Sequence, residues 1–370
     1  MKRETTLLIS SVLALVLVGV LMVYSASSVR ADAESRLERQ LVYVAIGLTV
    51  MFFAARFDYH RLRDRPIFRG VVLLSLALLG LVLLPGAGVL VDGAQRWVRI
   101  GGFQFQPSEV AKFALILLLA VKLTDNRQHI HRLFRGFIPP MLISALFAGL
   151  VLAERDLGVP VMMFGVAFVM LCAAGVRWGY LLASFVPACA AVLFLVLAYP
   201  HRLERLLAFL NPWDYRKTAG WQLIQSLSAF ARGSLTGLGA GAGEQKLGYL
   251  PAADTDFIFA VVGEELGLAG TLCVTGLFAA LAVAGYRIAM NAEDQFGSLL
   301  ATGIVALIAG QATFIMAVTT GLLPTKGLPL PFVSYGGTAL IVFLGLAGIL
   351  VNIGVQAHEQ QPERKLMPTG

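Results

Sequence analysis

Apolar residues along the chain gather into ten stretches that are separated by polar connections. Most stretches reach the about 20 residues that a helix needs to cross the hydrocarbon core of a bilayer. Because backbone groups in lipid must find hydrogen-bond partners within the protein, we expect helices here and not open strands. The ten stretches cover residues 7–27, 40–56, 67–88, 109–124, 137–153, 158–176, 178–199, 257–290, 297–323 and 335–356.

Composition and charge agree with a membrane-embedded chain. Hydrophobic residues make up 58% of the 370 positions and the mean hydropathy is +0.78, which leaves too little polar surface for a soluble protein. Lysine and arginine concentrate in the connections at 56–69 and 122–135, so the positive-inside rule places both termini in the cytoplasm. The formal charge of +7 suits loops that face anionic headgroups, and no nucleic-acid partner is expected.

These observations predict an all-α, polytopic membrane protein of about ten transmembrane helices. We expect one membrane domain over residues 1–356 and a cytoplasmic tail over 357–370. The domain should contain one long extracytoplasmic segment, residues 200–256, whereas most other connections are under about 20 residues.

The long outer segment does not resemble a disordered loop. HRLERLLAFLN places Leu203, Leu206, Leu207 and Leu210 on one helical face. A second helical stripe contains Trp221, Ile224, Leu227, Ala231 and Leu235. Two amphipathic helices of this kind would form a shelf at the outer membrane surface. The alternative is that they plug the helix bundle.

A glycine-rich run, GLGAGAG at 237–243, matches the spacing of a dinucleotide-binding fingerprint. That fingerprint requires a preceding strand and a following helix, and neither is expected in this segment. Two interpretations remain: a flexible linker, or a turn whose backbone N–H groups approach an anionic group.

Four carboxylates flank one short apolar run in DTDFIFAVVGEELG at 254–267. Asp256 and Glu264 would lie about 12 Å apart along a helix, farther than the roughly 5 to 9.5 Å of paired hydrolytic carboxylates. Asp254, Thr255 or Asp256 could serve as a helix N-cap, or an aspartate could act chemically. Glu264 and Glu265 lie deeper, where an ionised side chain is costly, so they must face a cavity or a cation or be protonated.

Six cations are expected on the same outer side of the membrane. Together they would suit a pyrophosphate group whose lipid tail stays in the bilayer, and the alternative is a structural network of ion pairs. The six are Arg96, Lys112, Arg155, Arg232, Lys246 and Lys326.

Several motifs together resemble the SEDS (shape, elongation, division and sporulation) family of membrane glycosyltransferases, over nearly the whole chain. AFLNPW at 208–213 and the LPTKG motif are closer to the division branch, FtsW, than to the elongation branch, RodA. The motifs are MVYSAS (22–27), GAQRWVRIG (93–101), FQPSEVAK (105–112), DLG (156–158), GWQLIQSLSAF (220–230), QKLGYLPAADTDFIFAVVGEELG (245–267) and LPTKGLPLPFVSYGG (323–337).

The resemblance implies an enzyme that polymerises lipid II into glycan strands outside the cytoplasmic membrane, at the division septum. Asp256 takes the position of the family's essential aspartate and would act as general base, with undecaprenyl pyrophosphate as the leaving group. The implied partners are a class B penicillin-binding protein, an FtsI-like transpeptidase, and other divisome proteins. A divalent cation, Mg²⁺ or Mn²⁺, could assist, and its ligands stay open.

Motif matches also assign the remaining site residues. The residues implied for substrate binding are Arg96, Trp97, Lys112, Lys246, Lys326 and Arg232. The residues implied for support are Glu264, Glu265, Asp254, Ser108 and Glu109.

The chain departs from the family pattern at two positions. Asp254 stands where histidine is common, and this added acid could raise the pKa of Asp256 or help to hold a metal. Arg155 stands where proline is common before DLG, which leaves the shape of that corner open. Two other functions are kept as alternatives: a lipid II transporter (flippase) that uses Glu264 and Glu265 as a polar path, and a noncatalytic divisome scaffold.

Overall fold

The computed structural model describes residues 2–28, 33–84, 88–91, 94–100 and 103–359. Most of the predicted cytoplasmic tail, residues 360–370, lies outside this set, as do Gly93 and Gly101 at the ends of the GAQRWVRIG motif.

Ten apolar helices form the body of the protein, and each overlaps one of the ten stretches expected from hydropathy. Their bounds are α1 Lys2–Ser27, α2 Ala33–Arg56, α3 Arg65–Leu83, α4 Pro107–Asp125, α5 Ile138–Ala153, α6 Gly158–Ala173, α7 Trp178–Leu197, α10 Ile258–Met290, α11 Gln295–Thr319 and α12 Gly337–Glu359. Eight helical segments are long and apolar enough to cross a membrane, and the apolar α6 is shorter. The polytopic all-α prediction is confirmed.

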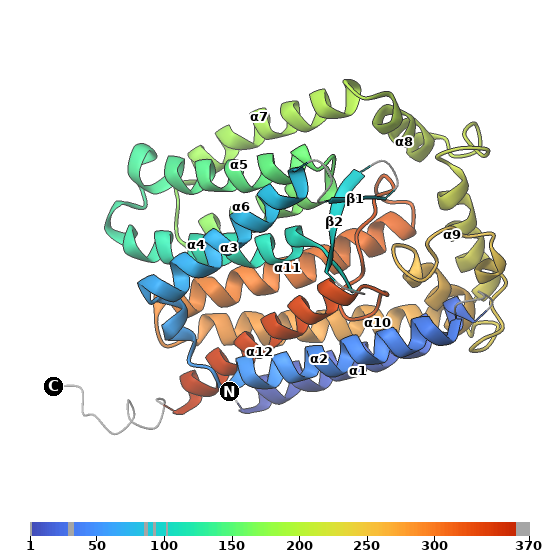
Figure 1. Ribbon diagram of the computed structural model, residues 1–370, viewed down its shortest axis with the longest axis horizontal. Helices are drawn as coiled ribbons and strands as arrows, with labels where there is room; N and C mark the ends of the chain where they lie inside the picture. The colour runs from blue at the N-terminus through green and yellow to red at the C-terminus, as the bar shows by residue number, and fades with distance from the viewer. Residues whose placement is uncertain (1, 29–32, 85–87, 92–93, 101–102, 360–370) are drawn as a thin grey trace.

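The helices run side by side, and the start of α1 lies near the end of α12. Figure 1 places the start of α1 and the end of α12 at one end of the bundle and the segment with α8 and α9 at the opposite end. A Cβ added to Gly354 of α12 would lie 2.8 Å from the Thr5 hydroxyl of α1, which confirms this proximity. The arrangement agrees with two cytoplasmic termini and an outer segment across the membrane.

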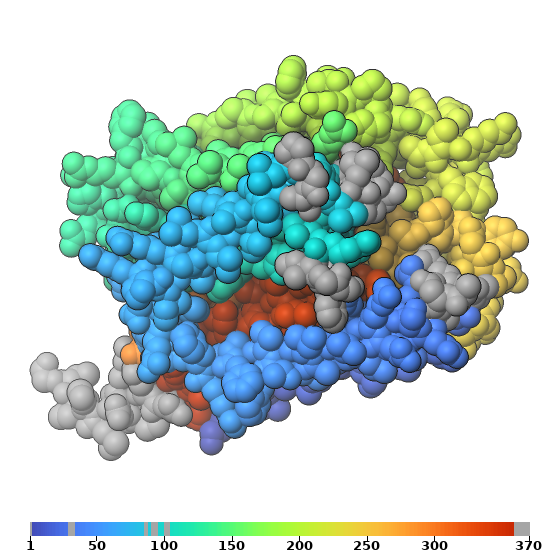
Figure 2. Space-filling view, in the orientation of Figure 1, coloured from blue at the N-terminus to red at the C-terminus, as the bar shows by residue number. Residues whose placement is uncertain are grey.

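The helices of the bundle differ in how much of their surface other helices cover. α2 lies along α12, and α1 lies along α10. In the space-filling view, atoms of the C-terminal part of the chain (red) are visible between those of α2 and α3 (blue) (Figure 2). α7 lies along one edge, and among its residues, all of which the structure describes, Leu181 alone is fully buried.

The outer segment contains α8 (Pro200–Leu210), α9 (Trp221–Gly233) and the short turn η4 (Gln245–Leu247). α9 packs against α10, and the Ser226 hydroxyl donates a 2.6 Å hydrogen bond to the Thr319 carbonyl of α11. Of the apolar stripe expected on α9, Trp221 and Leu227 are exposed, as a helix at the membrane surface requires, and Ile224 is buried. The other side of α9, with Leu223 and Ala229, is buried against the bundle, so α9 combines features of the shelf and of the plug.

A small antiparallel sheet follows α3 and was not predicted. It contains β1 (Gly88–Val91), β2 (Ala94–Ile100) and β3 (Phe103–Phe105), in the order β1-β2-β3. Val89 pairs with Trp97, and Val98 pairs with Phe105. The sheet places Arg96 and Trp97 near the outer end of the bundle.

Candidate active site

Asp256 lies at the end of the outer segment, just before α10. The N-cap of α10 is Phe257 and makes no side-chain cap hydrogen bond, so the prediction of an N-cap at Asp254, Thr255 or Asp256 is wrong. A tight turn precedes the helix: the N–H groups of Thr255 and Phe257 donate to the Ala252 carbonyl at 3.1 and 3.2 Å. The aspartate side chain is therefore not consumed by helix capping.

The connection between α11 and α12, residues 320–336, holds the Asp256 turn from the other side. The Ser334 hydroxyl donates to the Thr255 carbonyl at 2.6 Å, and the Tyr335 N–H donates to the Asp254 carbonyl at 2.9 Å. A Cβ added to Gly327 would lie 2.9 Å from Oδ2 of Asp256, so this glycine backbone lies directly against the carboxylate. The LPTKG motif thereby forms one wall of the site.

The electrostatic surroundings of Asp256 favour a proton acceptor that works near neutral pH. The side chain keeps some exposed surface, but the protein around it removes most of its hydration, and this burial raises its pKa to about 7. The guanidinium groups of Arg96 and Arg205 oppose the rise. The nearby carboxylates of Asp254 and Asp156 add to it.

Lys326 directly precedes Gly327, whose backbone lies against this carboxylate, and its side chain lies among other cations. Burial is the largest cause that lowers its pKa, to about 8, and Arg205, Arg202 and Arg96 lower it further, while Asp156 opposes them. Arg96 is held by Asp156 at 3.3 Å. Within the described part of the chain, Lys326 and Arg205 have no carboxylate within ion-pair distance. Positive charge is thus available next to Asp256, and an anionic ligand would find two cations without an ion-pair partner.

The two departures from the family pattern have local explanations. Asp254 forms a 2.5 Å ion pair with Arg36 of α2, and the Arg36 guanidinium lies 5.5 Å from the centre of the Tyr335 ring. Arg155 adopts a left-handed backbone with φ 64°, and Asp156 then accepts the Gly158 N–H at 2.8 Å in the first turn of α6. The DLG corner therefore forms without the proline.

Glu154, at the same corner, is a buried carboxyl without a hydrogen-bond partner on either oxygen. Burial raises its pKa to about 8, and the neighbouring Asp156 carboxylate adds to the rise against the opposing effect of Arg96. Glu154 is therefore harder to ionise than an exposed glutamate.

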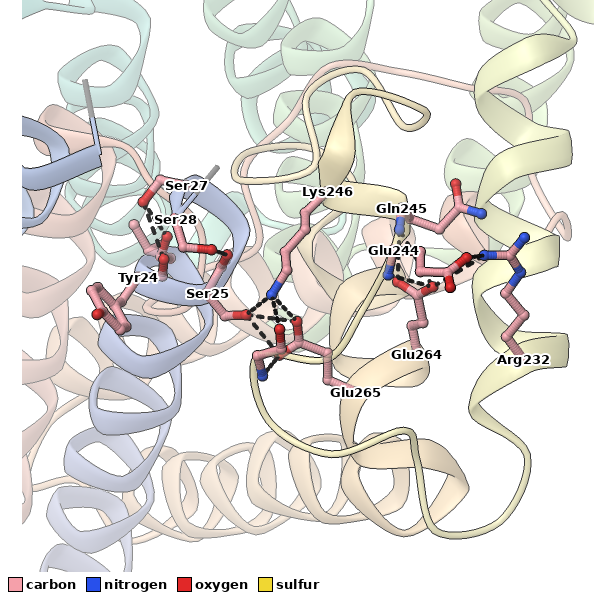
Figure 3. A network of polar contacts seen from close by, with 12 residues as sticks. Tyr24, Ser25, Ser27, Ser28, Arg232, Glu244, Gln245, Lys246, Glu264 and Glu265 are labelled. Atoms are coloured by element: carbon pink, nitrogen blue, oxygen red, sulfur yellow. Dashed lines mark hydrogen bonds and ion pairs between the residues drawn. The ribbon is translucent and has the colours of Figure 1, made fainter. Parts of the chain in front are cut away.

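The two deeper glutamates bind the outer segment (Figure 3). Glu264 accepts the N–H groups of Glu244 and Gln245 at 3.1 and 3.2 Å. Glu265 accepts from Lys246 at 2.9 Å and from the Ser25 hydroxyl at 2.6 Å. Both glutamates are fully buried. The prediction that they face a cation is confirmed for Glu265, and for Glu264 the main partners are backbone N–H groups, with Arg232 at 4.0 Å.

The glycine-rich run is not a free linker, because it pairs with an interruption of α10 at Gly267, where φ is 64° and ψ is −161°. The N–H groups of Leu238 and Gly239 donate to the Glu264 and Glu265 carbonyls, both at 3.0 Å. In return, the N–H group of Leu268 donates to the Ser234 carbonyl at 2.9 Å. The run also brings the Gly241 N–H to Oε2 of Glu265 at 2.9 Å, in agreement with the second interpretation of its sequence.

The expected convergence of six outer cations is only partial. Lys112 is buried, with Glu109 and Gln311 both at 2.9 Å. Lys246 pairs with Glu265, and Arg232 pairs with Glu244 at 2.5 Å. The structural network that sequence reasoning kept as an alternative thus accounts for these three cations. Ser108 lies beside Glu109 at the start of α4, fully buried, and its hydroxyl has no hydrogen-bond partner.

Residues that could hold a metal do not cluster in the described ranges. No group of three histidine, cysteine, aspartate or glutamate side chains comes together there. A site built from protein ligands alone therefore does not fit these residues. A cation that enters with a pyrophosphate would need only one or two carboxylates.

The chain matches a known protein family over nearly its whole length. The FtsW/RodA/SpoVE family, described as "Cell cycle protein", matches residues 5–359. The chain belongs to this family. A protein of Geobacter metallireducens named "Probable peptidoglycan glycosyltransferase FtsW" is 44% identical over 362 residues, covering 96% of each chain. Stage V sporulation protein E of Bacillus subtilis is 39% identical over 352 residues, covering 94% of this chain and 95% of that protein.

Solved structures of the FtsW/RodA/SpoVE family have the same fold. A chain from a study of the "structural coordination of polymerization and crosslinking by a peptidoglycan synthase complex" superposes with a TM-score of 0.81 at 28% identity, over 95% of this chain and 98% of that one. The rod shape determining protein RodA of Thermus thermophilus gives a TM-score of 0.69 at 27% identity, over 96% of each chain. The SEDS resemblance seen in the motifs is confirmed.

Sequence reasoning missed three residues that the structure brings to this end of the molecule. Arg205 comes from α8, Arg36 from α2 and Ser25 from α1. The first stood out only as the polar face of an amphipathic stripe, and the last lies inside the MVYSAS motif. Their partners lie between 51 and 240 positions away in sequence, so no local pattern identifies them.

Proposed function

We propose that the protein is a peptidoglycan glycosyltransferase that polymerises lipid II at the outer face of the cytoplasmic membrane. The observation that carries the proposal is Asp256, a carboxylate with its pKa raised to about 7, which lies at the outer end of the bundle against the Gly327 backbone and within the electrostatic reach of Arg96 and Arg205. The family fold and the activity for which the Geobacter relative is named support the same reaction.

In the proposed reaction, Asp256 accepts the proton of the acceptor sugar's 4-hydroxyl as that oxygen attacks the anomeric carbon of the donor. The new bond joins the acceptor oxygen to that carbon, and the carbon–oxygen bond to undecaprenyl pyrophosphate breaks on the opposite face. A single displacement of this kind inverts the anomeric carbon and needs one base, not a carboxylate pair.

The leaving pyrophosphate requires positive charge and not a second acid. Lys326 and Arg205 are the cations best placed to supply it, because no carboxylate neutralises them. Arg96 contributes from β2 while Asp156 holds it in position, and Trp97 is its neighbour on the same strand. If a divalent cation takes part, Mg²⁺ or Mn²⁺ would arrive with the pyrophosphate, since the described residues lack a three-ligand cluster.

The proposed partner is a class B penicillin-binding protein that crosslinks the new strands. The solved relative with the TM-score of 0.81 comes from a peptidoglycan synthase complex that coordinates polymerisation with crosslinking. The resemblance of the AFLNPW and LPTKG motifs to the division branch motivates a place at the division septum with other divisome proteins. The transporter alternative is weaker, because Glu264 and Glu265 are fully buried and bonded within the protein.

The test is polymerisation of lipid II by the purified protein with its cognate partner. We expect the Asp256→Ala variant to lose activity by about 10²- to 10⁴-fold, because a positioned base contributes that much. Asp254→His, which restores the family's usual residue, should keep activity. Normal polymerisation by Asp256→Ala would refute the assignment. Transbilayer movement of lipid II that survives Asp256→Ala but not Glu264→Gln would favour the transporter, and cell division complemented by Asp256→Ala would favour the scaffold.

A further inference from the structure

Four residues from three separated parts of the chain meet at the outer end of α1 and form what we term the outer clamp: Ser25, Gly241, Lys246 and Glu265. Figure 3 shows Ser25, Lys246 and Glu265 pointing toward one another. Lys246 Nζ donates to the Ser25 hydroxyl at 2.9 Å, to the Gly241 carbonyl at 2.6 Å and to the Glu265 carboxylate at 2.9 Å. Ser25 donates in turn to the same carboxylate at 2.6 Å. The clamp thus joins α1, α10 and the outer segment.

We infer that Lys246 is a positioning residue, which holds the segment that presents Asp256 and does not bind the pyrophosphate. This inference rests on the proposed function for its kinetic consequences. It reverses the expectation from the family motif, in which Lys246 belongs to the substrate cations.

The hydrogen bonds of Lys246 argue against a phosphate contact. An ammonium group has three donors, and all three are used within the clamp. The side chain is 4% exposed, and its ion-pair partner Glu265 is fully buried. Transfer of Lys246 to a ligand would leave the Glu265 charge buried without its cation, which is strongly unfavourable. Within the described residues, Lys326 and Arg205 have no ion-pair partner that would be left unpaired if they bound a ligand.

Several hydrogen bonds hold the segment that leads from the clamp to the active site. The Leu250 N–H donates to the Gln245 carbonyl at 2.9 Å, and the Trp221 indole donates to the Tyr249 carbonyl at 2.8 Å. The Ala252 turn follows and ends at Phe257. Because these bonds restrict how residues 245–257 can adjust, a shift at the clamp passes toward the carboxylate.

The α10 side of the clamp is equally constrained. Glu265 lies two residues before the interruption at Gly267, and its carbonyl accepts the Gly239 N–H at 3.0 Å while its side chain binds Lys246. Gly239 has φ 104°, a conformation that favours glycine. Backbone and side chain of one glutamate thus fix both ends of residues 239–246.

The experiment compares Lys246→Met with Lys217→Met, an exposed lysine of the same outer segment, in lipid II polymerisation with the cognate partner. We expect kcat to fall about 10- to 100-fold in Lys246→Met while KM for lipid II stays within about threefold, because small misplacements of a reacting group act on kcat. Lys217→Met should match the wild type. A tenfold rise in KM with unchanged kcat, or weaker inhibition by inorganic pyrophosphate, would overturn the inference.

A double variant separates the clamp from independent effects. If Lys246 and Glu265 act as one unit, Lys246→Met with Glu265→Gln should be no slower than the slower single variant, whereas multiplied losses would contradict the clamp. Should Lys246→Met fail to fold, Ser25→Ala takes its place. It keeps the ion pair and should lower kcat about two- to fivefold, since one net hydrogen bond is worth about 1 kcal/mol. An unchanged kcat in Ser25→Ala would count against the inference.

Hydrogen exchange judges the clamp independently of catalysis. Amides of residues 245–257 should exchange faster in Lys246→Met than in Lys217→Met, with α12 unchanged as an internal reference. If the wild type makes no glycan, the proposed function fails while this measurement still decides the clamp. Equal exchange in both variants would refute the positioning role.

Discussion

The outer turns of α10 and the whole of α7 are both strongly apolar, yet they pack in opposite ways. Every residue from Ile258 to Glu265 is buried, whereas α7 buries only Leu181 among its 20 described residues. Both helices qualify as membrane spans, with a mean hydropathy of 2.1 in the α10 window, which lies beyond the buried outer turns, and 2.4 in the α7 window. Hydropathy therefore predicts that both helices enter the membrane, but not which one packs inside the bundle.

The difference lies in small and polar residues. In lipid, helices associate through close packing and hydrogen bonds, because lipid tails are as apolar as leucine. α10 has Gly263 against α9, followed by two glutamates that bind the outer segment. α7 has no charged side chain and exposes Leu182, Phe185 and Phe194. A membrane helix with glycine and ionisable residues at its outer end is thus the one that builds the site.

Truncation of a leucine should give the largest difference in the free energy of unfolding between variants of the two helices. Leu281→Ala in α10 removes a fully buried side chain and should lower the free energy of unfolding by about 2 to 5 kcal/mol. Leu182→Ala in α7, where the side chain is 63% exposed, should change it by less than about 1 kcal/mol. Thermal unfolding in one detergent measures both. Equal losses would mean that α7 packs as tightly as α10.

Added methyl groups probe the same contrast by crowding. A Cβ on Gly233 would overlap the Gly263 carbonyl, so Gly233→Ala should destabilise the protein by about 1 to 3 kcal/mol. No atom lies within 4 Å of a Cβ on Gly179 of α7, and Gly179→Ala should be neutral or stabilising by up to about 1 kcal/mol. The contrast fails if the α7 variant unfolds at a lower temperature than the α9 variant.

The pH dependence should have opposite signs for activity and stability at the packed end. The base must be ionised, so kcat/KM should fall about tenfold per pH unit below the Asp256 pKa of about 7. The folded pKa lies above the ordinary value of 3.8, so the contribution of this group to stability is complete below pH 4 and is lost as pH rises through 7. Asp256→Asn should remove that part of the stability profile, and a profile identical to the wild type would contradict the raised pKa.

Much of the fold could be predicted from local pattern, because each span is long, apolar and bounded by polar residues. The small sheet at 88–105 could not, since its strands are short and interrupted by glycine. The candidate site likewise contains residues that motifs identify and residues that only the tertiary structure identifies. Family motifs place Asp256 and Lys326, whose surroundings are consistent with the proposed roles. They do not distinguish Lys326 from Lys246, because the partner that occupies Lys246 lies on another helix.

Tertiary packing also decides which side of α9 contacts the bundle. At a membrane surface a helical stripe of large apolar residues can face lipid, as the exposed Trp221 and Leu227 do. Ser226, Ala229 and Gly233 form the packed side instead. The departure at Asp254 likewise needed the position of Arg36 before it could be explained.

The interruption at Gly267 divides α10 mechanically. The nine residues from Ile258 to Leu266 are hydrogen-bonded to the outer segment, while the remainder of the helix continues through the bundle. A load applied to the outer segment by an external protein therefore reaches the short outer piece, and Asp256 with it, before it reaches the long inner rod. The interruption thus lets the outer piece of α10 move as a unit with the outer segment, separately from the rest of the helix.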